Sequence, residues 1–282
     1  LAKKTAQLHP DTPIYVLGML VHNSYVMRAL KELHIYPVDD KAKTRLELLD
    51  EIDEGIVIFT AHGISPAVKE KAAQKGLQCV DASCPDVMKT QDIVTEQLKK
   101  GCDVLYIGKP HHPEAEAVVS LSTKVHLIST EKDVEQLPAM EHVFVTNQTT
   151  MSIFDIEALF EAIRKRYPNA VFCEEICNAT RIRQQAVADL EDKQIDVLYV
   201  VGDKYSNNSN RLAQIARDQG IQQVYLIDDV QDVREEHLQD VQRVAVTSGA
   251  STPTYLTAQV IEYLEAYIPG KPKPEIRLSE IL

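Results

Sequence analysis

The chain has 282 residues, of which 44% are hydrophobic and 26% are charged, a composition typical of a globular protein with a hydrophobic core. Thirty basic against 42 acidic residues give a net charge of −12. This charge argues against nucleic acid as the main partner, because binding to phosphates needs a basic surface. No apolar run approaches the roughly 18 residues of a membrane span, so no membrane partner is expected.

Apolar, strand-like runs recur along the chain, and each one ends in polar residues. In chain order these runs, with their polar ends, lie at 56–63, 77–85, 104–114, 143–150, 197–211 and 244–251. In a parallel sheet the carboxyl ends of the strands meet at one edge, where ligands bind. The repeated placement of His, Cys, Glu and small polar residues at strand ends therefore predicts one convergent polar site.

Helical segments alternate with these strand-like runs. Residues 1–7 read as the last turns of a helix, and Ser65-Pro66 and Cys84-Pro85 begin two later ones. Alternation of this kind predicts an α/β fold with mainly parallel sheets. We expect three small α/β domains sharing one site and an irregular tail, with the boundaries 1–83, 84–176, 177–265 and 266–282.

The five cysteines are an odd number in a chain without a signal-like start, which indicates reduced thiols in the cytoplasm. Cys84 directly precedes a helix start and Cys177 lies ahead of a helical run, positions where backbone N–H groups favour the metal-binding thiolate. Inert burial of both remains an alternative. For Cys79, Cys102 and Cys173 we predict core positions. The spacings do not match a zinc ribbon, so zinc is only weakly indicated.

A second candidate group contains His112 and Glu114, two residues apart in a loop. Such a pair can deliver a proton, and partial burial would raise the pKa of the carboxyl toward the working pH. A helix cap is the alternative for Glu114. Gln148 and Thr149 could hydrogen-bond a small polar substrate group, while Thr150 could equally cap the next helix.

A third group offers hydroxyl, amide and imidazole donors near expected helix starts. Ordinary capping is the commoner use of such residues. Together they predict an anion site for a phosphate or diphosphate that needs little Lys or Arg. Its members are His22, His62, Ser206, Asn208 and Ser251.

Eight short motifs occur in the order found in the LytB family, the 4-hydroxy-3-methylbut-2-enyl diphosphate reductases. The chain resembles that family from about residue 14 to residue 265. Each motif alone is weakly specific, whereas eight in register are strong. They are VHN (21–23), AHG (61–63), SCP (83–85), HPE (112–114), QTT (148–150), EIC–AT (175–180), SNNSNR (206–211) and SGAS (248–251).

The resemblance implies three α/β domains around a central iron–sulfur cluster, which three cysteines hold and whose active 4Fe-4S form leaves one iron open. The substrate's allylic hydroxyl binds that iron, and water leaves after two electrons and a proton have arrived. The products are isopentenyl and dimethylallyl diphosphate, in the last step of the non-mevalonate (MEP) pathway. A ferredoxin or flavodoxin is the expected electron donor.

The resemblance also assigns roles to residues of this chain. Cys84 and Cys177 are similar to two cluster ligands, and Glu114 to the proton donor. His112 and Thr149 are similar to its hydrogen-bonding neighbours. The residues similar to the diphosphate-binding set are His22, His62, Ser206, Asn207, Asn208 and Ser251.

The third ligand has no match in the chain. In the family, the first cluster cysteine lies in a Gly-aromatic-Cys loop before the first helix. The sequence starts inside that helix, so this ligand is expected N-terminal to Leu1, and the chain starting at Leu1 is expected to hold no stable cluster. Two other hypotheses remain: a clusterless diphosphate-binding module without redox activity, and a zinc-dependent hydrolase.

Overall fold

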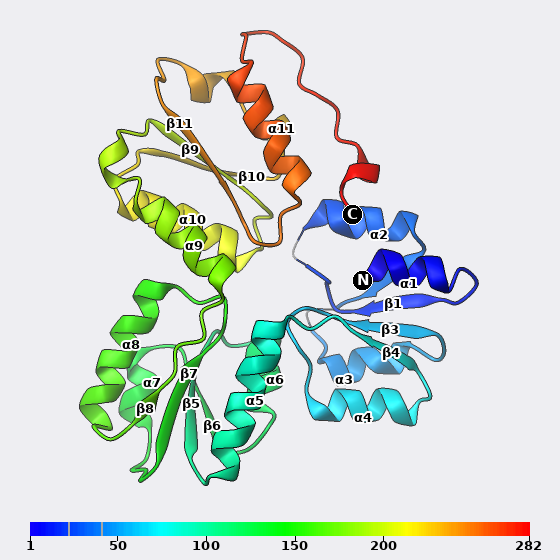
Figure 1. The fold of residues 1–282 in the computed structure, drawn as a ribbon, viewed down its shortest axis with the longest axis vertical. Helices are drawn as coiled ribbons and strands as arrows, with labels where there is room; N and C mark the ends of the chain where they lie inside the picture. The colour runs from blue at the N-terminus through cyan, green and yellow to red at the C-terminus, as the bar shows by residue number, and fades with distance from the viewer. Residues whose placement is uncertain (22, 41) are drawn as a thin grey trace. The chain divides into compact units, whose positions relative to one another are not determined.

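The computed structural model describes residues 1–21, 23–40 and 42–282, in which the strands form three sheets (Figure 1). Each described strand pair is parallel, which confirms the predicted α/β class. The fold groups into two compact units: residues 1–20 with 34–177, and residues 21–33 with 178–282. Division into three domains at the expected boundaries therefore stays a prediction, although each of the ranges contains one sheet.

The first sheet, in the larger unit, has the strand order β2-β1-β3-β4. Helices α3 and α4 cover one face of it, where Leu17 and Phe59 are buried. Strand β4 lies at the edge and is largely exposed, so the predicted core position of Cys79 is wrong: an edge strand has a neighbour on one side only. The elements are α1 (Ala2–Leu8), β1 (Ile14–Leu17), β2 (Ile35–Val38), α3 (Arg45–Leu48), β3 (Ile56–Phe59), α4 (Pro66–Gln74) and β4 (Gln78–Asp81).

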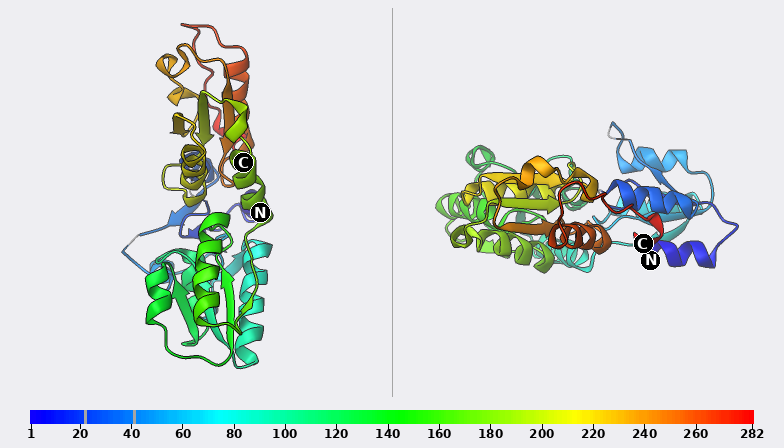
Figure 2. Two further views of the ribbon diagram at one scale, coloured as in Figure 1. Left: turned by 90° about the vertical axis from the view of Figure 1, so that its left-hand side faces the viewer. Right: turned by 90° about the horizontal axis from the view of Figure 1, so that it is seen from above.

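The second sheet, also in the larger unit, has the order β6-β5-β7-β8 and helices on both faces (Figures 1 and 2). Alternate residues of β5 divide between two cores: Val104 and Tyr106 pack toward α5 and α6, and Leu105 and Ile107 toward α7 and α8. The elements are α5 (Pro85–Lys99), β5 (Asp103–Ile107), α6 (Pro113–Val119), β6 (Val125–Ile128), α7 (Glu131–Gln136), β7 (Val143–Asn147), α8 (Ile153–Arg166) and β8 (Val171–Phe172).

The smaller unit contains the third sheet, in the order β10-β9-β11. Helices α9 and α10 pack on one face through residues such as Val187 and Leu212. Tyr25 of α2 donates a hydrogen bond to Asp229, which joins residues 21–33 to this unit. The elements are α2 (Ser24–Glu32), α9 (Asn178–Ala188), β9 (Val197–Val201), α10 (Asn207–Asp218), β10 (Gln223–Ile227), β11 (Val244–Ser248), α11 (Thr254–Glu265) and a short 3-10 helix of the tail, Leu278–Glu280.

The helix starts follow the local sequence signals. Ser65 accepts a hydrogen bond from the N–H of Val68 ahead of α4, and Cys84 is the N-cap residue of α5. The suggested cap at Thr150 is wrong, because the Ser152 hydroxyl accepts the first free N–H groups of α8 instead. Among the described residues no helix is both long and apolar enough to span a bilayer.

Candidate active site

Glu114 is the centre of a hydrogen-bonded group in the larger unit. It lies in the first turn of α6 and is 1% exposed. The backbone N–H of Thr149 donates to Oε1 over 2.7 Å, and the Thr149 hydroxyl lies 3.0 Å from Oε2. The Tyr106 hydroxyl also donates to Oε1 over 3.2 Å. The pairing of β5 with β7 brings these residues together, since α6 follows β5 and Thr149 follows β7.

The environment of Glu114 shifts the pKa of its carboxyl group. Burial raises the pKa of this carboxyl to about 7, and the bonds from Thr149 and Tyr106 oppose that rise. Burial likewise raises the pKa of Tyr106, so its hydroxyl stays protonated and acts as a donor to the carboxyl. A carboxyl that titrates near 7 can both hold and release a proton at working pH, as a general acid requires.

Two histidines lie beside this group. His112 is the N-cap residue of α6, and its Nδ1 accepts the N–H of Glu114 over 3.2 Å. The rings of His62 and His112 meet edge to face with centroids 5.4 Å apart. His62 lies in the loop after β3. The Thr60 hydroxyl oxygen lies 3.4 Å from the Nδ1 atom of His62 and accepts a hydrogen bond from the Arg45 guanidinium over 3.2 Å. His22 lies outside the described residues.

The two predicted metal-binding cysteines are also in the larger unit. None of the five cysteines forms a disulfide, and Cys84 and Cys177 are half-buried. The N–H of Cys177 donates to the Thr149 carbonyl over 2.9 Å, which brings its loop beside the loop that binds Glu114. The N–H of Cys84 donates to the Ala61 carbonyl over 3.0 Å, next to His62. Both thiols therefore belong to loops that neighbour the proton site.

Thiol ligands suit an iron–sulfur cluster, which cysteine thiolates typically hold. In the described part of the chain no group of three His, Cys, Asp or Glu side chains could hold a metal ion. Cluster binding by Cys84 and Cys177, together with a third ligand, therefore stays a prediction.

In the smaller unit the polar residues gather at the start of α10. Ser206 is its N-cap residue, and its hydroxyl accepts the N–H of Ser209 over 3.4 Å. Asn208 is buried, and among the described residues neither its amide nitrogen nor its amide oxygen has a hydrogen-bond partner. A buried amide without partners is costly unless a ligand supplies them. The first turn of α10 contains no acidic residue, so its N–H groups can attract an anion.

Two glycines let the ends of β9 and β11 approach this helix. A Cβ atom on either Gly202 or Gly249 would lie 2.2 Å from the Ser209 hydroxyl oxygen, a distance that real Cβ atoms essentially never show. The Thr252 hydroxyl donates to the Val201 carbonyl over 2.9 Å. The loop carrying Ser251 is thereby attached to the carboxyl edge of the sheet. Asn207 is the first residue of α10.

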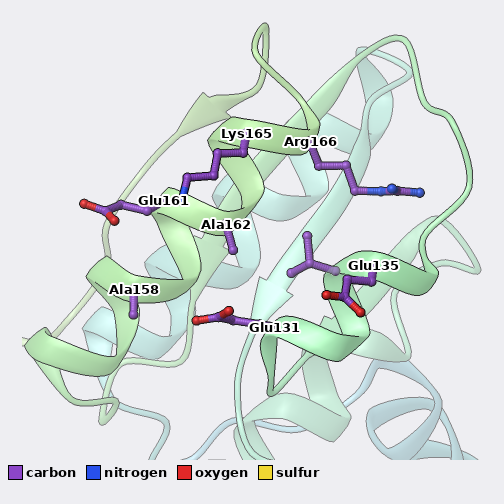
Figure 3. Close-up of a pocket in the computed structure, with 8 residues that line it drawn as sticks. Glu131, Glu135, Ala158, Glu161, Ala162, Lys165 and Arg166 are labelled. Carbon is purple, nitrogen blue, oxygen red and sulfur yellow. The ribbon is translucent and has the colours of Figure 1, made fainter.

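A separate groove between α7 and α8 contains none of the predicted site residues (Figure 3). The groove is lined by charges of both signs: Glu131, Glu135 and Glu161 are negative, and Lys165 and Arg166 are positive. We assign it no role in the candidate site.

Sequence reasoning missed Tyr106, Arg45 and Thr60. Tyr106 reads as an ordinary core residue because it alternates with apolar neighbours in β5, and its hydroxyl partner is evident only from the fold. Arg45 reads as a surface charge, yet burial lowers the pKa of its guanidinium. The sequence does not reveal these three residues, because each contact joins side chains from different chain segments.

The parallel sheets with helices packed on them, and the polar residues at the carboxyl ends of their strands, define an α/β protein of the class that binds ligands at the edge of a sheet. The model of the LytB protein family matches residues 1–265. The chain belongs to the LytB family.

Relatives and solved structures agree with this assignment. The chain is 47% identical to a 4-hydroxy-3-methylbut-2-enyl diphosphate reductase of Anoxybacillus flavithermus, over 96% of this chain and 86% of the relative. It is 48% identical to the Bacillus cytotoxicus protein of that name, over 96% and 87%. The solved structure of the Plasmodium falciparum E-1-hydroxy-2-methyl-but-2-enyl-4-diphosphate reductase has a TM-score of 0.85 at 27% identity, covering 98% of this chain and 90% of that chain.

Proposed function

We propose that the chain catalyses the reductive dehydroxylation of 4-hydroxy-3-methylbut-2-enyl diphosphate to isopentenyl and dimethylallyl diphosphate. The family match along residues 1–265 and the identity to named reductases carry this conclusion. They favour it over a clusterless diphosphate-binding module. Breaking the allylic C–O bond consumes two electrons and two protons: one proton leaves in water and the other forms the new C–H bond.

Glu114 is the proposed proton donor to the departing hydroxyl. This role is supported by its burial and by a pKa of about 7, which leaves a substantial protonated fraction at neutral pH. Thr149 is proposed to orient the carboxyl through its two contacts with both oxygens. His112, whose Nδ1 accepts from the backbone of Glu114, is proposed to line the hydroxyl end of the substrate.

The diphosphate is proposed to bind donors that the chain supplies without a lysine cluster. The unpartnered buried amide of Asn208 at the start of α10 supports this proposal most directly. An anchored diphosphate would hold the allylic alcohol in position, a large contribution to rate. The proposed binding set is His22, His62, Ser206, Asn207, Asn208 and Ser251.

Cys84 and Cys177 are the proposed cluster ligands. A bound 4Fe-4S cluster would supply the two electrons and a Lewis-acidic iron for the hydroxyl oxygen. The reduced, half-buried state of both thiols supports this role. A ferredoxin or flavodoxin is the proposed source of electrons, and a cytoplasmic location stays part of the proposal.

Two measurements on anaerobically purified protein test the function. The first is iron and acid-labile sulfide content, where about four of each per chain would indicate a full cluster with its third ligand present. The second is turnover of 4-hydroxy-3-methylbut-2-enyl diphosphate with a chemical reductant, read as products by mass spectrometry. Cys84→Ser and Cys177→Ser should lose iron, whereas the exposed Cys79 provides the matched control, Cys79→Ser. Iron-loaded protein that makes neither product would contradict the proposal.

A further inference from the structure

Two loops at the carboxyl edge of the second sheet are joined by hydrogen bonds that centre on Asn147, the last residue of β7. Its Oδ1 accepts the N–H of Glu175 over 3.0 Å, and its Nδ2 donates to the Gln148 carbonyl over 3.0 Å. Two residues further along each loop, the N–H of Cys177 donates to the Thr149 carbonyl over 2.9 Å. One loop carries a proposed cluster ligand, and the other carries the partner of the proposed acid.

Asn147 has properties that this arrangement requires. It is fully buried, and its one amide group provides both an acceptor and a donor. An apolar residue of similar size would leave the N–H of Glu175 without this acceptor, and buried N–H groups are rarely left unpaired.

The loop that contains Cys177 has a second anchor. The buried carboxylate of Glu175 pairs with Lys89 of α5 over 3.0 Å. Helix α5 begins directly after Cys84, so this ion pair ties the loop of one proposed ligand to the helix of the other. The two anchors act on the same residue: Asn147 holds the backbone of Glu175, and Lys89 holds its side chain.

We infer that Asn147 is a positioning residue that holds the Cys177 loop in register with the Glu114–Thr149 proton site. The catalytic meaning of this role rests on the proposed function. Without the bond to Glu175, the loop after β8 loses a buried attachment to β7 and depends more on the contact between Cys177 and Thr149 and on the ion pair with the largely exposed Lys89. The thiol and the acid would then no longer keep a fixed separation.

Alkylation of the metal-free, full-length chain tests this inference without turnover. Asn147→Ala should raise the rate of Cys177 labelling by iodoacetamide about ten-fold, because loss of buried hydrogen bonds increases local opening. Labelling of Cys84 in the same molecule should stay within about two-fold of wild type. The control Val143→Ala removes a buried side chain at the other end of β7 and should leave the ratio of the two rates unchanged.

The inference would be overturned if Asn147→Ala left the ratio of the Cys177 to the Cys84 labelling rate unchanged. It would also be overturned if Val143→Ala raised this ratio as much as Asn147→Ala does. If Asn147→Ala does not fold, amide hydrogen exchange of the wild type decides: the N–H groups of Glu175 and Cys177 should be protected, and rapid exchange of both would overturn the inference. These outcomes are independent of the reaction. A protein with the expected labelling and no reductase turnover would contradict the proposed function and leave the positioning role intact.

Discussion

Replacing Glu114 by glutamine should abolish turnover and, at the same time, stabilise the protein at alkaline pH. Glutamine keeps an oxygen that accepts from Thr149 and Tyr106, and its amide can donate to the Thr149 hydroxyl, so the buried contacts survive. What disappears is the ability to ionise. A stability gain on loss of activity is the pattern expected of a functional group held in an unfavourable environment.

The magnitude follows from the raised pKa of Glu114. Because the folded value exceeds the unfolded one, the carboxyl stabilises the fold fully below about pH 4.5, and this contribution is lost as pH rises to about 7. The change from 4.5 to about 7, at about 1.4 kcal/mol for each pH unit, corresponds to about 3 kcal/mol. At pH 4.5 the free energy of unfolding of Glu114→Gln should therefore equal that of wild type or be lower. Between pH 4.5 and pH 8 the difference, variant minus wild type, should increase by up to about 3 kcal/mol.

Urea unfolding of metal-free wild type and Glu114→Gln at pH 4.5, 6 and 8 measures this difference. Other groups titrate in both proteins and cancel in the comparison. A difference in unfolding free energy that does not change between pH 4.5 and 8 would refute the reasoning, since it would mean that Glu114 titrates normally in the folded chain. Binding of inorganic pyrophosphate should be unaffected by the substitution, which separates a lost proton from a lost site.

Two other substitutions probe the two halves of the candidate site. Tyr106→Phe removes a hydrogen bond that lowers the pKa of Glu114, so this pKa should rise. The fall of kcat/KM at alkaline pH should then move to higher pH. An unchanged pH profile would mean that this contact does not affect the pKa of Glu114. Asn208→Ala should weaken pyrophosphate binding, measured by calorimetry, about ten-fold, as expected for lost hydrogen bonds to a charged ligand. The exposed Asn169 provides the control Asn169→Ala. Equal affinity of the two variants for pyrophosphate would contradict the anion site.

Local sequence signals predicted the helices and strands and the chemical types of the residues at their ends. Ser65-Pro66 and Cys84-Pro85 start helices as predicted, because caps and first-turn prolines act through neighbouring residues. The parallel α/β class follows from alternating strands and helices. His112 and Glu114 meet for a similar reason: His112 is the N-cap residue of α6, and the hydrogen bond from the Glu114 N–H to its ring spans two positions. Their role as a proton-delivery pair stays a prediction.

Contacts between residues far apart in the sequence depend on how the strands are ordered in the folded chain. Thr149 lies 35 positions from Glu114 along the chain, and Asn147 lies 28 from Glu175, so strand order determines both contacts. The edge position of β4, which exposes Cys79, also depends on strand order. Local sequence encodes hydrogen bonds within a turn or helix, whereas burial and a pKa near 7 for Glu114 arise from the segments packed around it.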